Sequence, residues 1–60
     1  MKRSDKELTE IAAELRHETP GAYLLDDGDQ KVWVPKSMVE ANDDGTFTMP
    51  LWLAKDKGFL

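Results

Sequence analysis

The chain contains no cysteine and a single histidine, His17, among its 60 residues. The lack of cysteine excludes a disulfide framework and a thiolate metal site, so packing must stabilise the fold. It also fits a reducing, cytoplasmic compartment. With one histidine and no cysteine, nucleophile and base pairs of the serine or cysteine protease kind lack parts. We therefore predict a protein that is not an enzyme.

Long hydrophobic runs are also missing, and no segment approaches the length needed to cross a bilayer. Met1–Arg3 is basic like the start of a signal peptide, but the polar stretch Ser4–Glu7 follows where an apolar run is required. These features predict a cytoplasmic protein. A length of 60 residues allows one domain, residues 1–60, with a small core.

Positive charge is scarce, with 8 Lys and Arg against 12 Asp and Glu and a formal net charge of −4. The imbalance lies between residues 18 and 48, where Lys31 and Lys36 are the only basic residues. Such a region repels nucleic-acid phosphates and attracts basic partners. The charge pattern therefore favours binding to a protein with a basic surface over direct binding to nucleic acid.

The first part of the chain has the pattern of an amphipathic helix. Ser4–Glu7 has the S-x-x-E form of a capping box, and the apolar residues of Leu8–Leu15 follow at positions i, i+3, i+4 and i+7. Thr19–Gly21 contains Pro and Gly, which end helices. We predict a helix over Ser4–His17 that packs on a sheet.

The densest β-branched and aromatic run, Lys31–Val34, predicts the central strand of that sheet. Large apolar side chains on both of its faces require cover on both sides, so we expect Trp33 to be mostly buried. Ala22–Asp26 is expected to pair with it in a hairpin whose turn contains Gly28. Pro35 should end the strand.

A second hairpin is predicted from Val39–Asn42 and Thr46–Met49, around the turn Asp43–Gly45. Pro50 then suits the first position of a short helix, Leu51–Lys57, with Gly58 at its C′ position. The predicted fold class is α+β, with the N-terminal helix packed on a three- or four-stranded antiparallel sheet and a short C-terminal helix.

The remaining candidate sites have structural explanations. Each pair of adjacent aspartates flanks a turn glycine, where aspartate bonds to the backbone. Glu40–Gly45 resembles the start of a calcium loop, but position 12 is Leu51 instead of a bidentate Glu, so we predict no metal and no cofactor. Trp33, Trp52 and Tyr23 could form a base-stacking platform, but it would lack a basic groove, which favours a core role.

From residue 17 onward the chain resembles a group of small phage and prophage proteins that has no established activity. The residues that carry the resemblance are Glu18–Thr19, Ala22–Leu25, Val32–Ser37, Val39–Glu40, Asp43–Thr46, Pro50–Lys55 and Lys57–Gly58. The W-x-P-K-S and P-x-W-L-A motifs are its most specific parts. The chain departs from the pattern at Met38 and Leu51, which add apolar surface that a contact would use.

The resemblance implies a protein active in a host cell and favours two functions. The first is stoichiometric inhibition of a host nucleic-acid-binding or defence complex, as anti-CRISPR proteins do. The alternative is an accessory module of phage replication or recombination that contacts single-stranded nucleic acid or a replication protein. A structural or regulatory protein without a nucleic-acid connection is a third interpretation.

For the first function the candidate contact residues are acidic: Asp26, Asp27, Asp29, Glu40, Asp43 and Asp44. The alternative apolar contact consists of Met38, Leu51 and Phe59. A homodimer is also predicted, because apolar residues crowd into Leu51–Leu60 beyond what a small core can cover.

Overall fold

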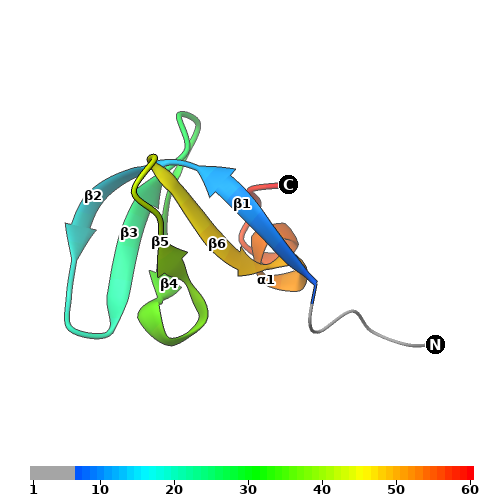
Figure 1. Ribbon diagram of the computed structural model, residues 1–60. Helices are drawn as coiled ribbons and strands as arrows, with labels where there is room; N and C mark the ends of the chain where they lie inside the picture. Colours follow the sequence, from blue (N-terminus) through cyan, green and yellow to red (C-terminus); the bar gives the residue numbers. More distant parts are fainter. Residues whose placement is uncertain (1–6) are drawn as a thin grey trace.

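The computed structural model describes residues 7–60, which form two antiparallel sheets of three strands each and one short C-terminal helix. The elements in chain order are β1 (Leu8–Ala12), β2 (Glu14–Glu18), β3 (Ala22–Asp26), β4 (Lys31–Pro35), the 3-10 turn η1 (Lys36–Met38), β5 (Glu40–Ala41), β6 (Thr46–Pro50) and α1 (Leu51–Asp56). One sheet has the order β1-β6-β5 and the other the order β2-β3-β4. The predicted α+β class is therefore wrong, because the described chain is mostly β (Figure 1).

The predicted N-terminal helix is wrong over its described part, which forms β1 and β2 instead; Ser4 lies outside the described residues. Only Ile11 of the apolar stripe that suggested it is buried, whereas Leu8 is 61% and Leu15 is 42% exposed. Within β1, Ile11 is buried and Thr9 is half-buried, whereas the residues between and beside them are exposed. This alternation is the period of a strand with one face on the core.

Pairing with distant segments explains this outcome. All five residues of β1 pair with β6, and the Leu51 N–H extends the ladder by donating to the Glu7 carbonyl at 2.9 Å. Strand β2 pairs with β3 in the same antiparallel way. An isolated helix of this length is only marginally stable in water, so the hydrogen bonds of two sheets outweigh the local preference.

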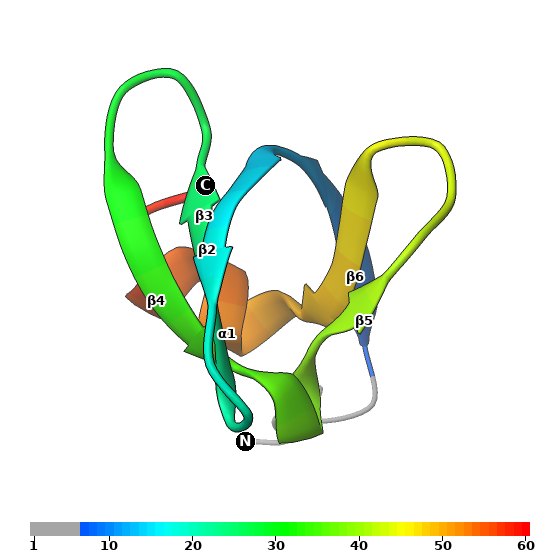
Figure 2. The same ribbon diagram turned by 90° about the vertical axis from the view of Figure 1, so that its left-hand side faces the viewer.

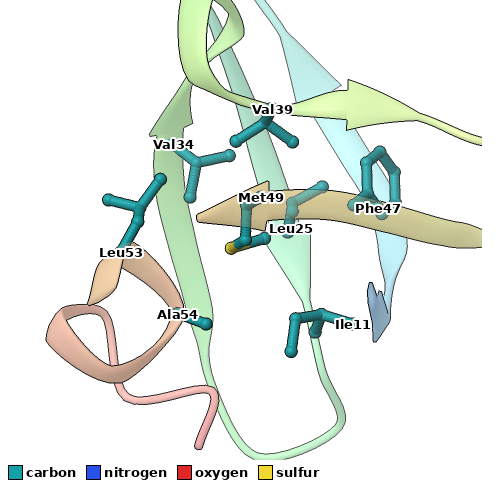
Figure 3. Close-up of a cluster of buried hydrophobic side chains, with 8 residues drawn as sticks. All are labelled: Ile11, Leu25, Val34, Val39, Phe47, Met49, Leu53 and Ala54. Atoms are coloured by element: carbon teal, nitrogen blue, oxygen red, sulfur yellow. The ribbon is translucent and has the colours of Figure 1, made fainter. Parts of the chain in front are cut away.

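The core lies between the two sheets and is closed by α1 (Figure 2). Its buried side chains, drawn in Figure 3, are Ile11, Leu25, Val34, Val39, Phe47, Met49, Leu53 and Ala54. They come from five strand or loop segments and the helix, so no single element can bury its apolar face alone. The described residues contain no buried polar or charged side chain.

Strands β3 and β4 form the predicted hairpin, but β3 and not β4 is the middle strand of its sheet. Val34 is 1% exposed on the inner face, whereas Trp33 points to the outer face and is 44% exposed. The expectation of a buried Trp33 is therefore wrong. Trp33 is exposed because the second sheet packs on only one face of the β2-β3-β4 sheet and leaves the other face open.

The second hairpin, β5–β6, also forms as predicted, with Phe47 and Met49 buried on its inner face. The Asn42 Nδ2 donates to the hydroxyl oxygens of Thr46 and Thr48, at 2.9 Å each. These bonds hold the loop to the strand that follows it.

The C-terminal helix is confirmed as Leu51–Asp56. Gly58 has a φ of 87° and donates its N–H to the Lys55 carbonyl, while the Phe59 N–H donates to the Ala54 carbonyl. This pair of bonds is the Schellman motif expected for a glycine at C′. It turns Phe59 back against the core.

Candidate functional site

The two aspartate-rich hairpin turns lie at the same end of the molecule, with the β1–β2 corner between them (Figures 1 and 2). The Ala13 N–H at this corner donates to the Gly45 carbonyl of the β5–β6 turn at 3.4 Å. A hollow of about 500 Å³ opens here and is lined by Ala12, Ala13, Glu14, Arg16, Asp26, Asp27, Gly28 and Gly45. We call this region, defined by the two turns, residues 26–30 and 42–46, and by residues 12–16, the acidic end.

The β3–β4 turn is built by its own aspartates. The Asp26 Oδ1 accepts the Gly28 N–H at 2.8 Å, and the Asp27 Oδ1 accepts the N–H groups of Asp29 and Gln30 at 2.9 and 3.0 Å. Gly28 has a φ of 100°, a value that glycine adopts without the steric cost of a side chain. Asp29 is exposed and makes no side-chain bond within residues 7–60.

The β5–β6 turn uses the same chemistry. The Asp44 Oδ1 accepts both the N–H and the hydroxyl of Thr46, at 3.1 and 2.6 Å. Gly45, with a φ of 87°, completes a three-residue loop that is closed by the bond from the Asn42 N–H to the Thr46 carbonyl. Asp43 is exposed, and its carboxylate has no bonding partner in the described chain.

Arg16 is a residue of the acidic end that sequence reasoning missed. Its Nε donates to the Asp26 Oδ2 at 3.0 Å, and its guanidinium lies 3.1 Å from a Glu14 oxygen. The register of β2 against β3 shifts between Leu15 and His17, at the position of Arg16. No local sequence signal marks the pairing of Arg16 with Asp26, because it depends on β2 lying beside β3. The helix interpretation placed Arg16 in a different element.

The contacts at the acidic end shift three pKa values. The pKa of Asp26 is lowered, first by the hydrogen bond from the Gly28 backbone and then by the Arg16 side chain. The pKa of Asp44 is lowered, first by the Thr46 hydroxyl and then by the Thr46 N–H. The Asp26 hydrogen bond raises the pKa of Arg16, with Glu14 adding to the effect. These carboxylates are therefore ionised at neutral pH.

Glu40 does not join the other predicted acidic residues. It lies opposite Thr48 in the β5–β6 ladder and borders a second hollow of about 400 Å³. The lining of that hollow is otherwise Leu8, Ser37, Met38, Val39, Thr48 and Pro50.

The three residues of the alternative apolar contact also do not form one surface. Met38 is exposed at the second hollow, Leu51 is half-buried in α1, and Phe59 packs against the core. Within the C-terminal segment that suggested a dimer, Leu53 is buried and Phe59 packs against the core, whereas Trp52 and Leu60 are exposed.

The three aromatic residues of the suggested stacking platform do not share a face. Tyr23 packs inward, with its ring 5.8 Å from that of Phe47. Trp33 points outward from the same sheet, and Trp52 lies on α1. His17 meets Trp33 edge-on, with ring centroids 6.1 Å apart.

No cluster of three or more His, Asp or Glu side chains within residues 7–60 is arranged to hold a metal ion. No helix in this part of the chain is long and apolar enough to cross a membrane. The chain matches no protein-family model, no curated protein and no solved structure. The acidic end offers the exposed carboxylates of Asp29, Asp43 and Asp44, with those of Asp26 and Asp27 partly buried beside them.

Proposed function

We propose that this chain is a protein-binding domain whose acidic end binds a basic surface of another protein. The observation that carries this proposal is the placement of both aspartate-rich turns at one end of the molecule (Figure 2), beside a hollow lined by Asp26 and Asp27 of one turn and Gly45 of the other. Carboxylates gathered in this way add their potentials, which speeds encounter with a basic partner and orients it. The bonds from Asp26, Asp27 and Asp44 to backbone N–H groups build both turns, so the backbone that carries Asp29 and Asp43 is already ordered before binding.

The partner surface that fits best is one that normally binds nucleic acid. Such surfaces carry Lys and Arg side chains that neutralise phosphates, and a fixed set of carboxylates competes for the same cations. The chain would then act stoichiometrically, as an inhibitor of a host nucleic-acid-binding or defence complex. This choice of partner follows from the phage origin that the resemblance in the sequence implies.

The test uses two carboxylates that contribute charge without building a turn. Asp29→Asn and Asp43→Asn remove two charges from the acidic end, whereas Asp26, Asp27 and Asp44 hold turn N–H groups and stay intact. The control variant carries Glu10→Gln and Glu40→Gln, which remove two exposed charges outside both turns. Both variants therefore have the same net charge.

The probe is a synthetic lysine-rich peptide, titrated at low and at physiological salt. We expect the acidic-end variant to bind about fivefold more weakly, equivalent to about 1 kcal/mol, and the control to bind as the unmodified chain does. Binding should weaken as salt rises. Equal weakening in both variants would show that net charge alone acts and would reject the acidic end as a site.

A parallel titration with a single-stranded oligonucleotide tests the alternative function. Removing negative charge should strengthen contact with a phosphate backbone. Tight oligonucleotide binding that improves in the acidic-end variant would contradict the proposal and favour the nucleic-acid module.

A further inference from the structure

Strand β4 has an edge with which no other strand of residues 7–60 pairs, and it forms the outer border of its sheet (Figure 2). The Asp27 N–H donates to the Gln30 carbonyl, and the Lys36 N–H donates to the Gly21 carbonyl. These two bonds show which residue pairs of the β3–β4 ladder are hydrogen-bonded. Because hydrogen-bonded and non-bonded pairs alternate in an antiparallel ladder, the N–H and C=O groups of Val32 and Val34 point toward β3. Those of Lys31, Trp33 and Pro35 therefore point to the unpaired edge.

This edge has the usual protection against strand pairing only at its ends, in Lys31 and Pro35. Natural edge strands are shortened, charged or covered, because their unpaired N–H and C=O groups are templates for another strand. β4 has five residues in the order Lys, Val, Trp, Val, Pro, with one charge at its start and a half-exposed Trp33 at its centre. β2, the opposite edge strand, has a register shift and carries Glu14, Arg16 and Glu18.

We propose that β4 pairs antiparallel with β4 of a second copy of this chain, around a two-fold axis at Trp33. The strand is self-complementary, because the sequence Val-Trp-Val reads the same in both directions. Trp33 is the middle residue of β4, so only the register centred on it overlaps both strands over their full length. The two sheets then join into one sheet of six strands.

The register places compatible groups opposite each other. Trp33 exchanges two backbone hydrogen bonds with its copy, and the Lys31 N–H of each chain donates to the Pro35 carbonyl of the other. Val32 lies opposite Val34, and the two Trp33 side chains are neighbours on the outer face. Lys31 stands opposite Pro35, so no like charges are paired directly.

Strand pairing in this register cannot continue beyond Pro35. Pro35 has no N–H to donate, and beyond it the chain leaves the sheet in η1, so the ladder stops after five residues. Both chains use the same β4 edge in the two-fold pairing, so neither β4 edge stays free and the assembly is a closed dimer. The interface is small, so we expect self-association only at high protein concentration.

Salt separates this proposal from the acidic-end proposal, on which it does not depend. Each chain carries a formal charge of −4, so two copies repel and added salt should strengthen the dimer by screening. Binding of a basic partner at the acidic end should weaken under the same change.

The first measurement needs no substitution. Sedimentation over a concentration series should show a monomer–dimer equilibrium, and amide hydrogen exchange at Trp33 should slow as concentration rises. A monomer at all concentrations, or Trp33 exchange that does not depend on concentration, would overturn the proposal.

The second measurement uses the opposed Trp33 side chains. Trp33→Glu and Trp33→Lys each place like charges across the axis and should abolish the dimer, while an equimolar mixture of the two should restore a mixed dimer. Far-UV circular dichroism checks that each variant is folded. Trp52→Glu, at the other exposed tryptophan (39%), is the matched control and should leave the dimer intact. A dimer that survives both Trp33 variants, or one that only Trp52→Glu disrupts, would contradict the β4 interface.

Discussion

The Asp26 carboxylate joins two strands and a turn, because one oxygen accepts from Arg16 Nε at 3.0 Å and the other from the Gly28 N–H at 2.8 Å. Arg16 is exposed, so this ion pair by itself contributes little to the free energy of unfolding. Its main effect is geometric. It holds β2 against β3 where the register shifts and partly neutralises one side of the acidic end.

The pH dependence of stability should reflect Asp26 and Asp44, whose pKa values lie below 3.8 in the folded chain. A carboxyl with a lowered folded pKa stabilises the fold fully above its unfolded pKa, and this stabilisation is lost as pH falls through the folded pKa. We therefore expect the free energy of unfolding to decrease below about pH 4. Urea unfolding at several pH values measures it.

A variant with Asp26→Asn and Asp44→Asn should lose part of this acid sensitivity, because neither position then titrates. Asp43→Asn serves as the control, since its carboxylate builds no turn bond in the described chain. An acid transition that is identical in the double variant and the unmodified chain would contradict the assignment.

The opposite environments of Leu25 and Trp33 predict opposite sensitivities to truncation. Leu25 is fully buried between the sheets, so Leu25→Ala should lower the free energy of unfolding by about 2–5 kcal/mol. Trp33 is half-exposed, and Trp33→Ala should cost well under half as much. Urea unfolding at a protein concentration that keeps the chain monomeric compares them. A larger loss from Trp33→Ala would show that this side chain belongs to the core.

Gly45 and Gly58 share a φ of 87° but differ in surroundings. Alanine at either position pays about 1–2 kcal/mol for the left-handed conformation. At Gly45 a Cβ meets nothing within 4 Å, whereas at Gly58 it lies 3.0 Å from the Gln30 Nε2, which donates to the Lys57 carbonyl. We expect Gly58→Ala to lower the melting temperature more than Gly45→Ala. Equal shifts would mean that the Gln30 contact does not matter.

The elements that sequence reasoning predicted correctly are those specified by neighbouring residues. Both hairpins form around Gly28 and Gly45, and Gly58 is the C′ residue that follows α1. In each case a glycine supplies a conformation that other residues adopt at a cost, and nearby polar side chains satisfy the turn. Such signals act over a few residues and need no distant partner.

The N-terminal segment shows the limit of the same reasoning. The apolar residues of this segment do have helical spacing, but a strand also buries Ile11 on one face. Pairing with β6 decides in favour of the strand. β6 lies more than thirty residues further along the chain. The exposure of Trp33 has the same origin, because it depends on which face the second sheet covers.

For the candidate site, the sequence by itself determined that the aspartates lie in or next to hairpin turns. Only the tertiary structure decided that the two turns share one end, that Glu40 lies apart from them and that Arg16 pairs with Asp26. The physical reason is that turn chemistry is local, whereas the position of one turn relative to another depends on sheet pairing and burial between segments far apart in the chain.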